Sequence, residues 1–414
     1  MSYKSMPYEP LSKLYYKTPE QYESAYDRRF HAPSTVHLDT AIQEIGRQRA
    51  YPAFFCYTPS MVSLLTDIYK GCFQLRQFIE RHVPAALMEH AVFSSIVDEV
   101  KSTNDIEGVF STRREISEAL QSLKQKKKGK RFHSIVSKYA MLTSSEPIPF
   151  ASCADIRRFY DEFALPEVCA EDPDNAPDGE VFRRGPVSIG SPTGKDIHRG
   201  LMPEAAILRE MDTALHILHH DELPRVIGIA VFHYLFGYIH PFYDGNGRTS
   251  RFITSYYLSR EFDLPILGVR LSAAIKKDLP RYYMLFEAAN KELNRGELTF
   301  FIEGFLDIVR QSAADSLVLL QEKIEGLMKF QQRLNDTLQA SASSPDELTQ
   351  RIYFILLQAA IFQTGGATIQ EIAATAEKSR NTIDSRIAQI PASHYIKDTS
   401  VKPYRYRLNL LFLK

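Results

Sequence analysis

Several features that would indicate nucleic acid, zinc or a membrane as a partner are missing from this sequence. Lysine plus arginine and aspartate plus glutamate both number 50, so there is no overall basic charge, and nucleic-acid binding would need a local patch. The four cysteines are widely spaced without a CxxC pair, which argues against zinc and for reduced thiols. No run of about 18 apolar residues and no apolar signal core is present, so we expect a cytoplasmic protein without membrane contact.

The composition is that of an ordinary globular protein, and its patterning is mainly helical. The chain has 414 residues, 44% of them hydrophobic and 24% charged, which suggests two or three domains with sizeable cores. We expect an irregular N-terminal arm containing a helix near Thr40–Arg49, and a short strand at Tyr51–Tyr57. Apolar residues at three- and four-residue steps predict further helices at 60–81, 84–103, 135–142, 203–219 and 224–239, two within 277–311, and one at 314–340.

The stretch His240–Arg251, HPFYDGNGRTSR, is the most informative in the chain. It follows a segment that is apolar almost all round, which predicts a central, buried helix. Residues 244–247, Asp-Gly-Asn-Gly, favour a turn, and the next helix is expected from Arg248 to Glu261. The pattern therefore predicts a loop that leads from one buried helix into the N-terminus of another.

This arrangement suits a phosphate group. The N–H groups and dipole of a helix N-terminus attract an anion, and glycines allow it to approach the backbone. Arg248 and Arg251 are three residues apart and share one helical face, so both can reach phosphate oxygens. Asp244 can ligate Mg²⁺ together with phosphates, and His240 can take a proton near neutral pH.

Two other features bear on this loop. Alternation around Val187–Ile189, followed by a turn at Gly190–Gly194, predicts a short hairpin. Histidines are the other feature: we interpret His233 as a hydrogen-bonded core residue. His216, His219 and His220 are interpreted as solvated side chains near a helix C-terminus rather than as metal ligands.

The motif HPFxDGNGRxxR stands in this sequence without substitution, and by it the chain resembles Fic-domain enzymes. The resemblance covers about residues 50–340. It implies a helical bundle with a small hairpin, the flap, formed here by Val187, Ser188, Ile189 and Gly190. It also implies transfer of AMP from ATP to a Tyr, Thr or Ser hydroxyl of a protein target. The intact Gly247-Arg248 pair favours AMP transfer over the phosphorylation catalysed by the Doc-type branch.

The resemblance also implies a role for each motif residue. His240 is the general base and Phe242 anchors the loop in the core. Asp244 ligates Mg²⁺, while Arg248 stabilises the leaving pyrophosphate and Arg251 holds the γ-phosphate of ATP. The anion hole consists of Gly245, Asn246 and Gly247, and a weaker match places Tyr282, Tyr283 and Asn290 at the nucleotide pocket.

A second, shorter motif lies far upstream. Residues 103–108, TNDIEG, resemble the family's inhibitory motif [S/T]xxxE[G/N], placed N-terminal to the Fic core as in class II members. The resemblance implies that Glu107 pairs with Arg251 and keeps it from the γ-phosphate. The plainer interpretation is that Glu107-Gly108 is only the end of a helix.

The last 70 residues show a different pattern. Three short helices and two strands around Ser400–Pro403 predict a winged helix-turn-helix after a linker at Ser341–Pro345. Arg380, Asn381 and Arg386 are suited to phosphates and base edges, so DNA is one expected partner. Docking of a protein is the other.

These patterns predict three domains. Residues 1–130 form an N-terminal helical region with the inhibitory helix, residues 131–340 the Fic catalytic domain, and residues 346–414 the winged helix. The expected substrates are ATP with Mg²⁺ and a protein whose identity the sequence does not give. The chain itself is one candidate for that protein. Three alternatives stay open: a nucleotide-sensing DNA-binding regulator, a Fic enzyme that removes AMP, and one that uses another donor. Assembly into a homo-oligomer is also left open.

Overall fold

The computed structural model describes residues 8–124, 131–144, 146–190, 196–340, 345–363, 366–400 and 402–413. The chain divides into two compact units. The first comprises residues 1–74 and 95–314, and the second residues 75–94 and 315–414. The three predicted domains stay a prediction, and the predicted linker falls largely outside the described residues.

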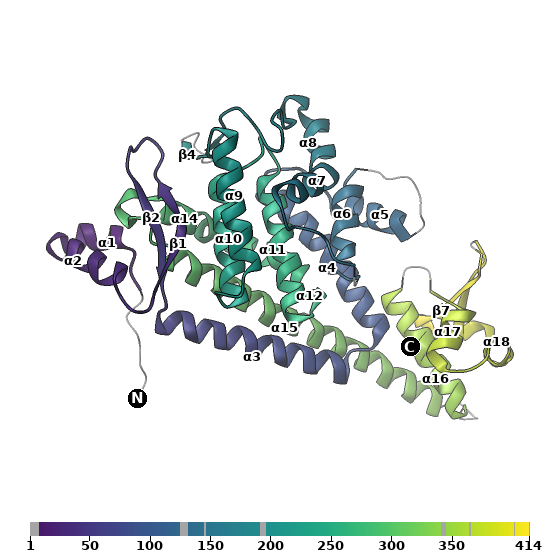
Figure 1. Ribbon diagram of the computed structural model, residues 1–414. Helices are drawn as coiled ribbons and strands as arrows, with labels where there is room; N and C mark the ends of the chain where they lie inside the picture. Colours follow the sequence, from purple (N-terminus) through teal and green to yellow (C-terminus); the bar gives the residue numbers. More distant parts are fainter. Residues whose placement is uncertain are drawn as a thin grey trace, which may run out of the picture. The chain divides into compact units, whose positions relative to one another are not determined.

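Helices make up most of the first unit, as predicted (Figure 1), and those at 59–82, 85–106 and 299–339 have residues in the second unit as well. Before the motif they are α1 (Leu11–Lys17), α2 (Pro19–Phe30), α3 (Pro59–His82), α4 (Ala85–Ile106), α5 (Arg113–Lys124), α6 (His133–Met141), α7 (Cys153–Phe163), α8 (Leu165–Glu171), α9 (Glu204–His219) and α10 (Arg225–Ile239). From the motif onward they are α11 (Asn246–Phe262), α12 (Pro265–Gly268), α13 (Leu271–Lys277), α14 (Leu279–Asn290) and α15 (Thr299–Gln339). Among the helices of the described chain, none is long and apolar enough to cross a membrane.

Helix α10 is the centre of this unit and packs against α9 and α11 (Figure 1). Every residue of α10 except Arg225 and Gly237 is buried, which confirms the prediction from its apolar pattern. His233 is fully buried within it, and its ring nitrogens lie 2.8 Å from the Thr254 and Tyr282 hydroxyls. The prediction of a hydrogen-bonded core histidine is confirmed.

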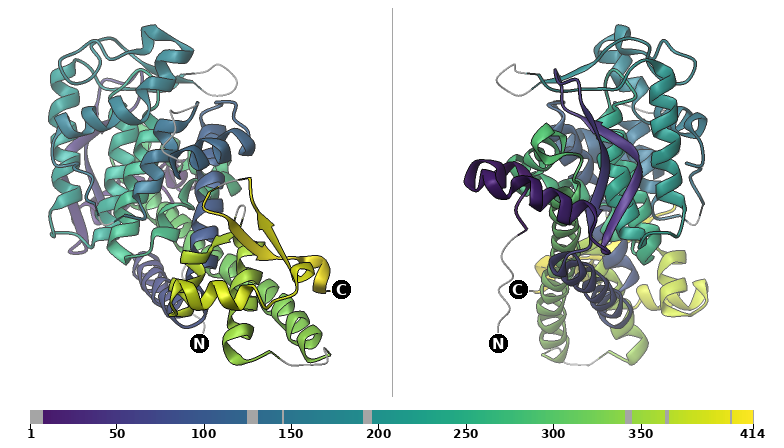
Figure 2. Two further views of the ribbon diagram at one scale, coloured as in Figure 1. Left: turned by 90° about the vertical axis from the view of Figure 1, so that its right-hand side faces the viewer. Right: turned by 60° about the vertical axis from the view of Figure 1, so that its left-hand side comes forward.

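Two antiparallel hairpins accompany the helices. One is β1 (Thr35–Gln43) with β2 (Ala50–Cys56), which lies beside α9 (Figure 2). The other is β3 (Ser188–Gly190) with β4 (Asp196–Arg199), which pairs Ser188 with Arg199. The hairpin predicted at Val187–Ile189 is therefore present, while most of its predicted turn lies outside the described residues.

Two predicted elements were wrong. The predicted helix near Thr40–Arg49 is the end of strand β1 and the turn that leads to β2. In β1, Val36, Leu38 and Ile42 alternate with exposed side chains, and the strand pairs with β2. The helix predicted from Ala314 begins at Thr299 and runs for 41 residues. The sequence between the two predicted helices contains no proline or glycine, so nothing interrupts it.

The second unit contains the end of α3, the start of α4, most of α15, the C-terminal helices and a small sheet. Its C-terminal elements are α16 (Glu347–Phe362), β5 (Ala367–Thr368), α17 (Ile369–Ala376), α18 (Arg380–Ile387), β6 (Tyr395–Asp398) and β7 (Arg405–Leu408). The strands form one antiparallel sheet in the order β5-β7-β6. The predicted helices and strands are all present, while their assignment to a winged helix stays a prediction.

Candidate active site

The motif loop, residues 240–247, is held by contacts from several elements. Phe242 is fully buried and stacks on Tyr160 of α7, with ring centroids 3.6 Å apart. Asn246 accepts a hydrogen bond from the Phe242 N–H at 2.9 Å and donates one to its carbonyl at 2.8 Å. The Tyr160 hydroxyl donates to the Asp244 carbonyl at 3.0 Å. These contacts fix the loop before it enters α11.

Two residues of the loop adopt left-handed backbone conformations. His240 has φ 52° at the end of α10, and Gly245 has φ 75° just before α11. Glycine adopts this conformation at no steric cost, whereas a histidine there must be held by its surroundings. The surroundings of His240 therefore hold its backbone in this conformation, at the junction between α10 and the loop.

The environment of His240 favours its neutral form. Burial lowers the pKa of His240 to about 3, and the nearby His198 and Arg183 lower it as well. A neutral imidazole can accept a proton, which a general base requires.

Arg248 lies completely buried in the first turn of α11. Its guanidinium is 3.3 Å from the Asp244 carboxylate and 3.7 Å from that of Glu167. Burial raises the pKa of Glu167 to about 7, against the lowering effect of Arg248. Glu167 was not identified from the sequence, because nothing in the short helix α8 distinguishes it from a surface carboxylate.

Arg251 is enclosed by α4, the helix that carries the upstream motif. Its Nη2 lies 2.8 Å from the Glu107 carboxylate, and its Nε donates to the Thr103 hydroxyl at 2.8 Å. Nη2 also donates to the Thr103 carbonyl at 3.1 Å. Burial alone would lower the pKa of Arg251, but the Glu107 carboxylate raises it. The structure thus brings together two residues that the sequence paired only through a resemblance.

The Glu107 carboxylate lies over the start of α11. A Cβ atom added to Gly247 would meet Glu107 Oε1 at 2.1 Å and Arg251 Nη1 at 2.8 Å. The absence of a side chain at Gly247 therefore lets a carboxylate approach the helix N-terminus, where N–H groups and the dipole favour an anion. Glu107 stands where a phosphate is expected.

The three residues predicted at the nucleotide pocket differ in their burial. Tyr282 is buried, with its hydroxyl at His233, and the Asn290 amide oxygen accepts from the Tyr234 hydroxyl at 2.7 Å. Tyr283 is 43% exposed and donates to the Ile106 carbonyl at 3.0 Å, next to Glu107. Of the three, Tyr283 is the one with a face open to a ligand.

Asp244 is the predicted magnesium ligand. Its side chain is 36% exposed, so one carboxylate could be shared with a cation and phosphates, which is how Mg²⁺ is commonly held. Among the described residues, no group of three or more His, Cys, Asp or Glu side chains is placed to hold a metal ion.

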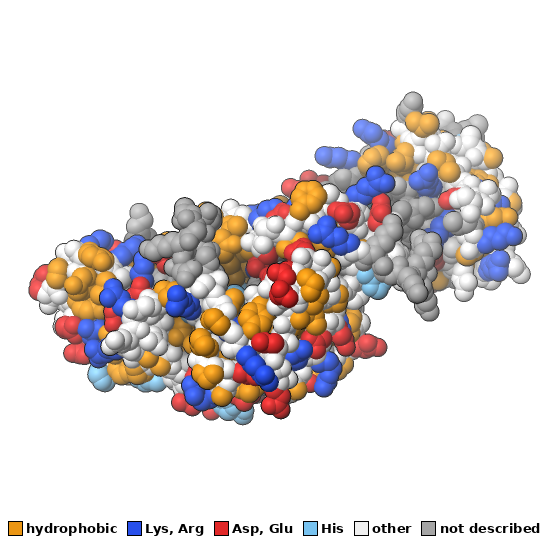
Figure 3. Space-filling model, turned by 90° about the horizontal axis from the view of Figure 1, so that it is seen from above, with side chains coloured by type: hydrophobic (Ala, Val, Ile, Leu, Met, Phe, Trp, Pro, Cys, Tyr) orange, Lys and Arg blue, Asp and Glu red, His pale blue; other side chains and the backbone are white. Residues whose placement is uncertain are grey.

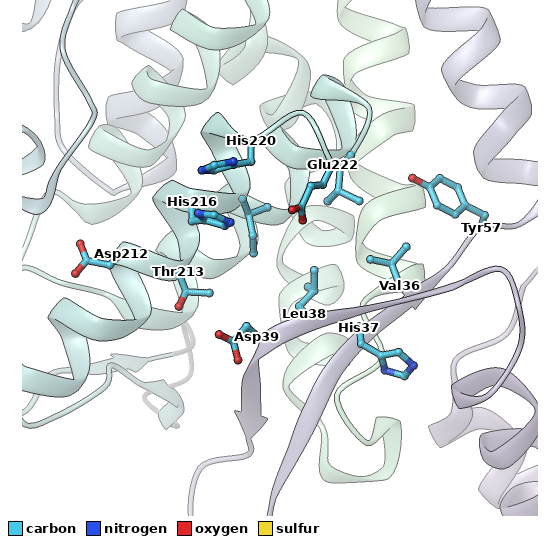
Figure 4. Close-up of a pocket in the computed structure, with 12 residues that line it drawn as sticks. Val36, His37, Leu38, Asp39, Tyr57, Asp212, Thr213, His216, His220 and Glu222 are labelled. Carbon is cyan, nitrogen blue, oxygen red and sulfur yellow. The ribbon is translucent and has the colours of Figure 1, made fainter.

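A separate cavity of about 630 Å³ lies between β1 and the end of α9 (Figure 4). His216 and His220 line it from the end of α9, with ring centroids 3.7 Å apart. Val36 and Leu38 line it from β1. No residue of the motif loop lines this cavity.

The C-terminal residues predicted to contact DNA differ in their surroundings. Arg380 and Asn381 begin α18 and are exposed. Arg386 instead pairs with Asp346 at 2.6 Å. On the molecular face in Figure 3, basic and acidic side chains are interspersed.

Comparison with known proteins agrees with this site. Residues 169–258, which end within α11, match the model of the Fic/DOC family. Over this segment the chain is similar to Fic/DOC family proteins, and the curated relatives that it matches are Fic protein adenylyltransferases. The Protein adenylyltransferase Fic of Drosophila melanogaster and that of Drosophila sechellia are each 29% identical to it over 135 residues, which is 33% of this chain. The match spans only 25% of each relative.

A solved structure supports the fold over a longer range. A Fic family protein from Desulfovibrio desulfuricans G20 aligns with a TM-score of 0.50 at 17% identity, over 85% of this chain and 96% of its own. The mainly helical Fic fold with a small hairpin is confirmed, and a small C-terminal sheet is present, while the winged helix stays a prediction.

Proposed function

We propose that this protein is a Fic-type protein adenylyltransferase that its own Glu107 holds inactive. The observation that carries the proposal is the position of the Glu107 carboxylate, 2.8 Å from Arg251 and over Gly247 at the start of α11. An anion already occupies the place that the loop offers to a phosphate. ATP and Glu107 would therefore compete for one arginine and one helix N-terminus.

The proposed reaction uses the residues around the loop. The target hydroxyl oxygen forms a bond to the α-phosphorus of ATP, and the bond between that phosphorus and the pyrophosphate oxygen breaks. His240 takes the hydroxyl proton, which its neutral state permits. Arg248 and the first-turn N–H groups of α11 would neutralise charge on the phosphates, a contribution typical of phosphoryl-transfer sites.

Asp244 would hold Mg²⁺, which neutralises phosphate charge when bound. Asp244 fits this role because its half-buried carboxylate adjoins Gly245 and Arg248, where the phosphates would lie. The hydrogen bond from Arg248 at 3.3 Å orients that carboxylate.

Labelled ATP tests the proposal. The chain carrying Glu107→Gly is incubated with α-labelled or γ-labelled ATP, and the modified residue is identified by mass spectrometry. We expect the α-label on protein, with a mass increase of one AMP, and no label with His240→Ala. A γ-label on protein would indicate a kinase, and the absence of either label would contradict the proposal.

A further inference from the structure

Arg183 lies just before the β3–β4 hairpin and is completely buried. Its guanidinium donates to three backbone carbonyls: Nε to His240 at 2.9 Å, Nη1 to Gly185 at 2.6 Å and Nη2 to Leu201 at 2.9 Å. Among the described residues, no carboxylate forms an ion pair with it, and burial lowers the pKa of Arg183. All three nitrogens of the planar guanidinium therefore donate to backbone oxygens.

The three carbonyls belong to the two ends of the hairpin and to the proposed base. Gly185 precedes β3 and Leu201 follows β4, while His240 directly follows α10. Backbone hydrogen bonds run alongside: Gly200 donates to Val187 at 3.1 Å, and Leu201 to Ile239 at 3.0 Å. The side chain of Arg183 thus ties three separate segments together at one point.

Space around this point is tightly filled. A Cβ atom added to Gly200 would meet Arg183 Nη2 at 2.2 Å and the His240 Cβ at 3.0 Å. His240 also keeps a left-handed backbone, which is uncommon for a residue other than glycine and persists where the surroundings determine it. The hydrogen bond from Arg183 to the His240 carbonyl is one of those determinants.

We infer that Arg183 is a positioning residue, which holds His240 and both ends of the β3–β4 hairpin as one unit. The inference rests on the proposed function, because it concerns the position of the base, His240, relative to the β3–β4 hairpin. In the proposed function, that hairpin would contact the target protein. A lysine would present a single ammonium in place of the planar fork and could not reach all three carbonyls in the same geometry. An error of about 1 Å in such a position can reduce a rate about 100-fold.

The test compares Arg183→Met and Arg183→Lys with Arg184→Met, which removes the neighbouring, exposed arginine. All three are made in the full chain with Glu107→Gly. We expect both Arg183 variants to lower kcat about 100-fold without changing the KM for ATP. Arg184→Met should retain the kcat of the parent. An unchanged kcat in both Arg183 variants would overturn the inference.

Amide hydrogen exchange decides the matter without any enzymatic activity. In the same variants we expect faster exchange at residues 185–188, 199–201 and 238–243 with Arg183→Met. Exchange in α7 and in the C-terminal half of α11 should stay as in the parent, which shows that the unit is folded. Unchanged exchange around the hairpin would overturn the inference, as would loss of protection throughout the unit. If the parent chain with Glu107→Gly transfers no AMP, the proposed function is contradicted. The exchange experiment still tests whether Arg183 holds the hairpin and His240 together.

Discussion

The Glu107 carboxylate lies 2.8 Å from the guanidinium of Arg251, which is 1% exposed. The two residues are far apart in the chain: Glu107 directly follows α4, and Arg251 lies in α11. Their contact joins the upstream motif, residues 103–108, to the motif at residues 240–251. In our proposal, it makes Glu107 a competitor of ATP for Arg251. The predictions below follow from the groups around this pair.

Thr103→Val should release the arginine partially. The substitution keeps the shape of the side chain but removes the oxygen that accepts from Arg251 Nε at 2.8 Å. A hydrogen bond to a charged group contributes roughly 1.5–3 kcal/mol, of which the retained Glu107 pair will recover a part. We expect self-labelling by α-labelled ATP to rise about tenfold, and less than with Glu107→Gly. Labelling at the unaltered level would show that Thr103 does not restrain Arg251.

The pH dependence of transfer should reflect the depressed pKa of His240. Burial and the charges of His198 and Arg183 disfavour the imidazolium, so the base stays deprotonated below the ordinary histidine pKa. With Glu107→Gly in place, we expect the acid limb of kcat/KM to lie well below pH 6.5, as long as circular dichroism shows a folded chain. An acid limb of kcat/KM at or above pH 6.5 would contradict a lowered pKa for His240.

Asp244→Asn should abolish the effect of magnesium while leaving the fold intact. The amide can still occupy the place beside Gly245 and Arg248, so the thermal unfolding midpoint should change little. Loss of the anionic ligand should reduce transfer at least 100-fold and remove the difference in ATP affinity with and without Mg²⁺. Isothermal titration calorimetry with ATP measures that difference. If magnesium still strengthens ATP binding to the variant, its ligand lies elsewhere.

The C-terminal unit contains one arginine in an ion pair and one that is exposed, and their substitutions should have different effects. Arg386 pairs with Asp346, so Arg386→Ala should lower the stability of this unit by up to about 1 kcal/mol, as expected for a surface ion pair. Arg380 is exposed, so Arg380→Ala should leave stability unchanged. If DNA is the partner, retention of the chain on double-stranded DNA should fall with salt and with Arg380→Ala. Absence of retention at any salt concentration would leave protein docking as the role of this unit.

The sequence predicted those parts of the molecule whose signals are local. The all-round apolar pattern identified α10, and the turn residues at 244–247 identified the start of α11. The end of β1 and the turn after it were predicted as a helix, because the alternation in β1 is short and its pairing with β2 decides the structure. Local propensity at such segments yields to tertiary context.

The network around the motif could not be predicted in the same way. Arg183 and Glu167 acquire their significance from partners more than 50 residues away along the chain, and each stands in an unremarkable local sequence. Burial of a charged side chain is visible only when its neighbours are placed. The resemblance supplied the pairing of Glu107 with Arg251, whereas the role of Thr103 as a second holder of the arginine came from the structure.

Self-labelling by α-labelled ATP tests the central claim most directly, when the unaltered chain is compared with Glu107→Gly under the same conditions. Removal of an ion pair worth a few kcal/mol shifts an equilibrium by roughly 10- to 1,000-fold, since each 1.4 kcal/mol is a factor of ten. Our account predicts an increase in labelling of at least about tenfold, which His240→Ala abolishes. Equal labelling of the two proteins would contradict autoinhibition by Glu107.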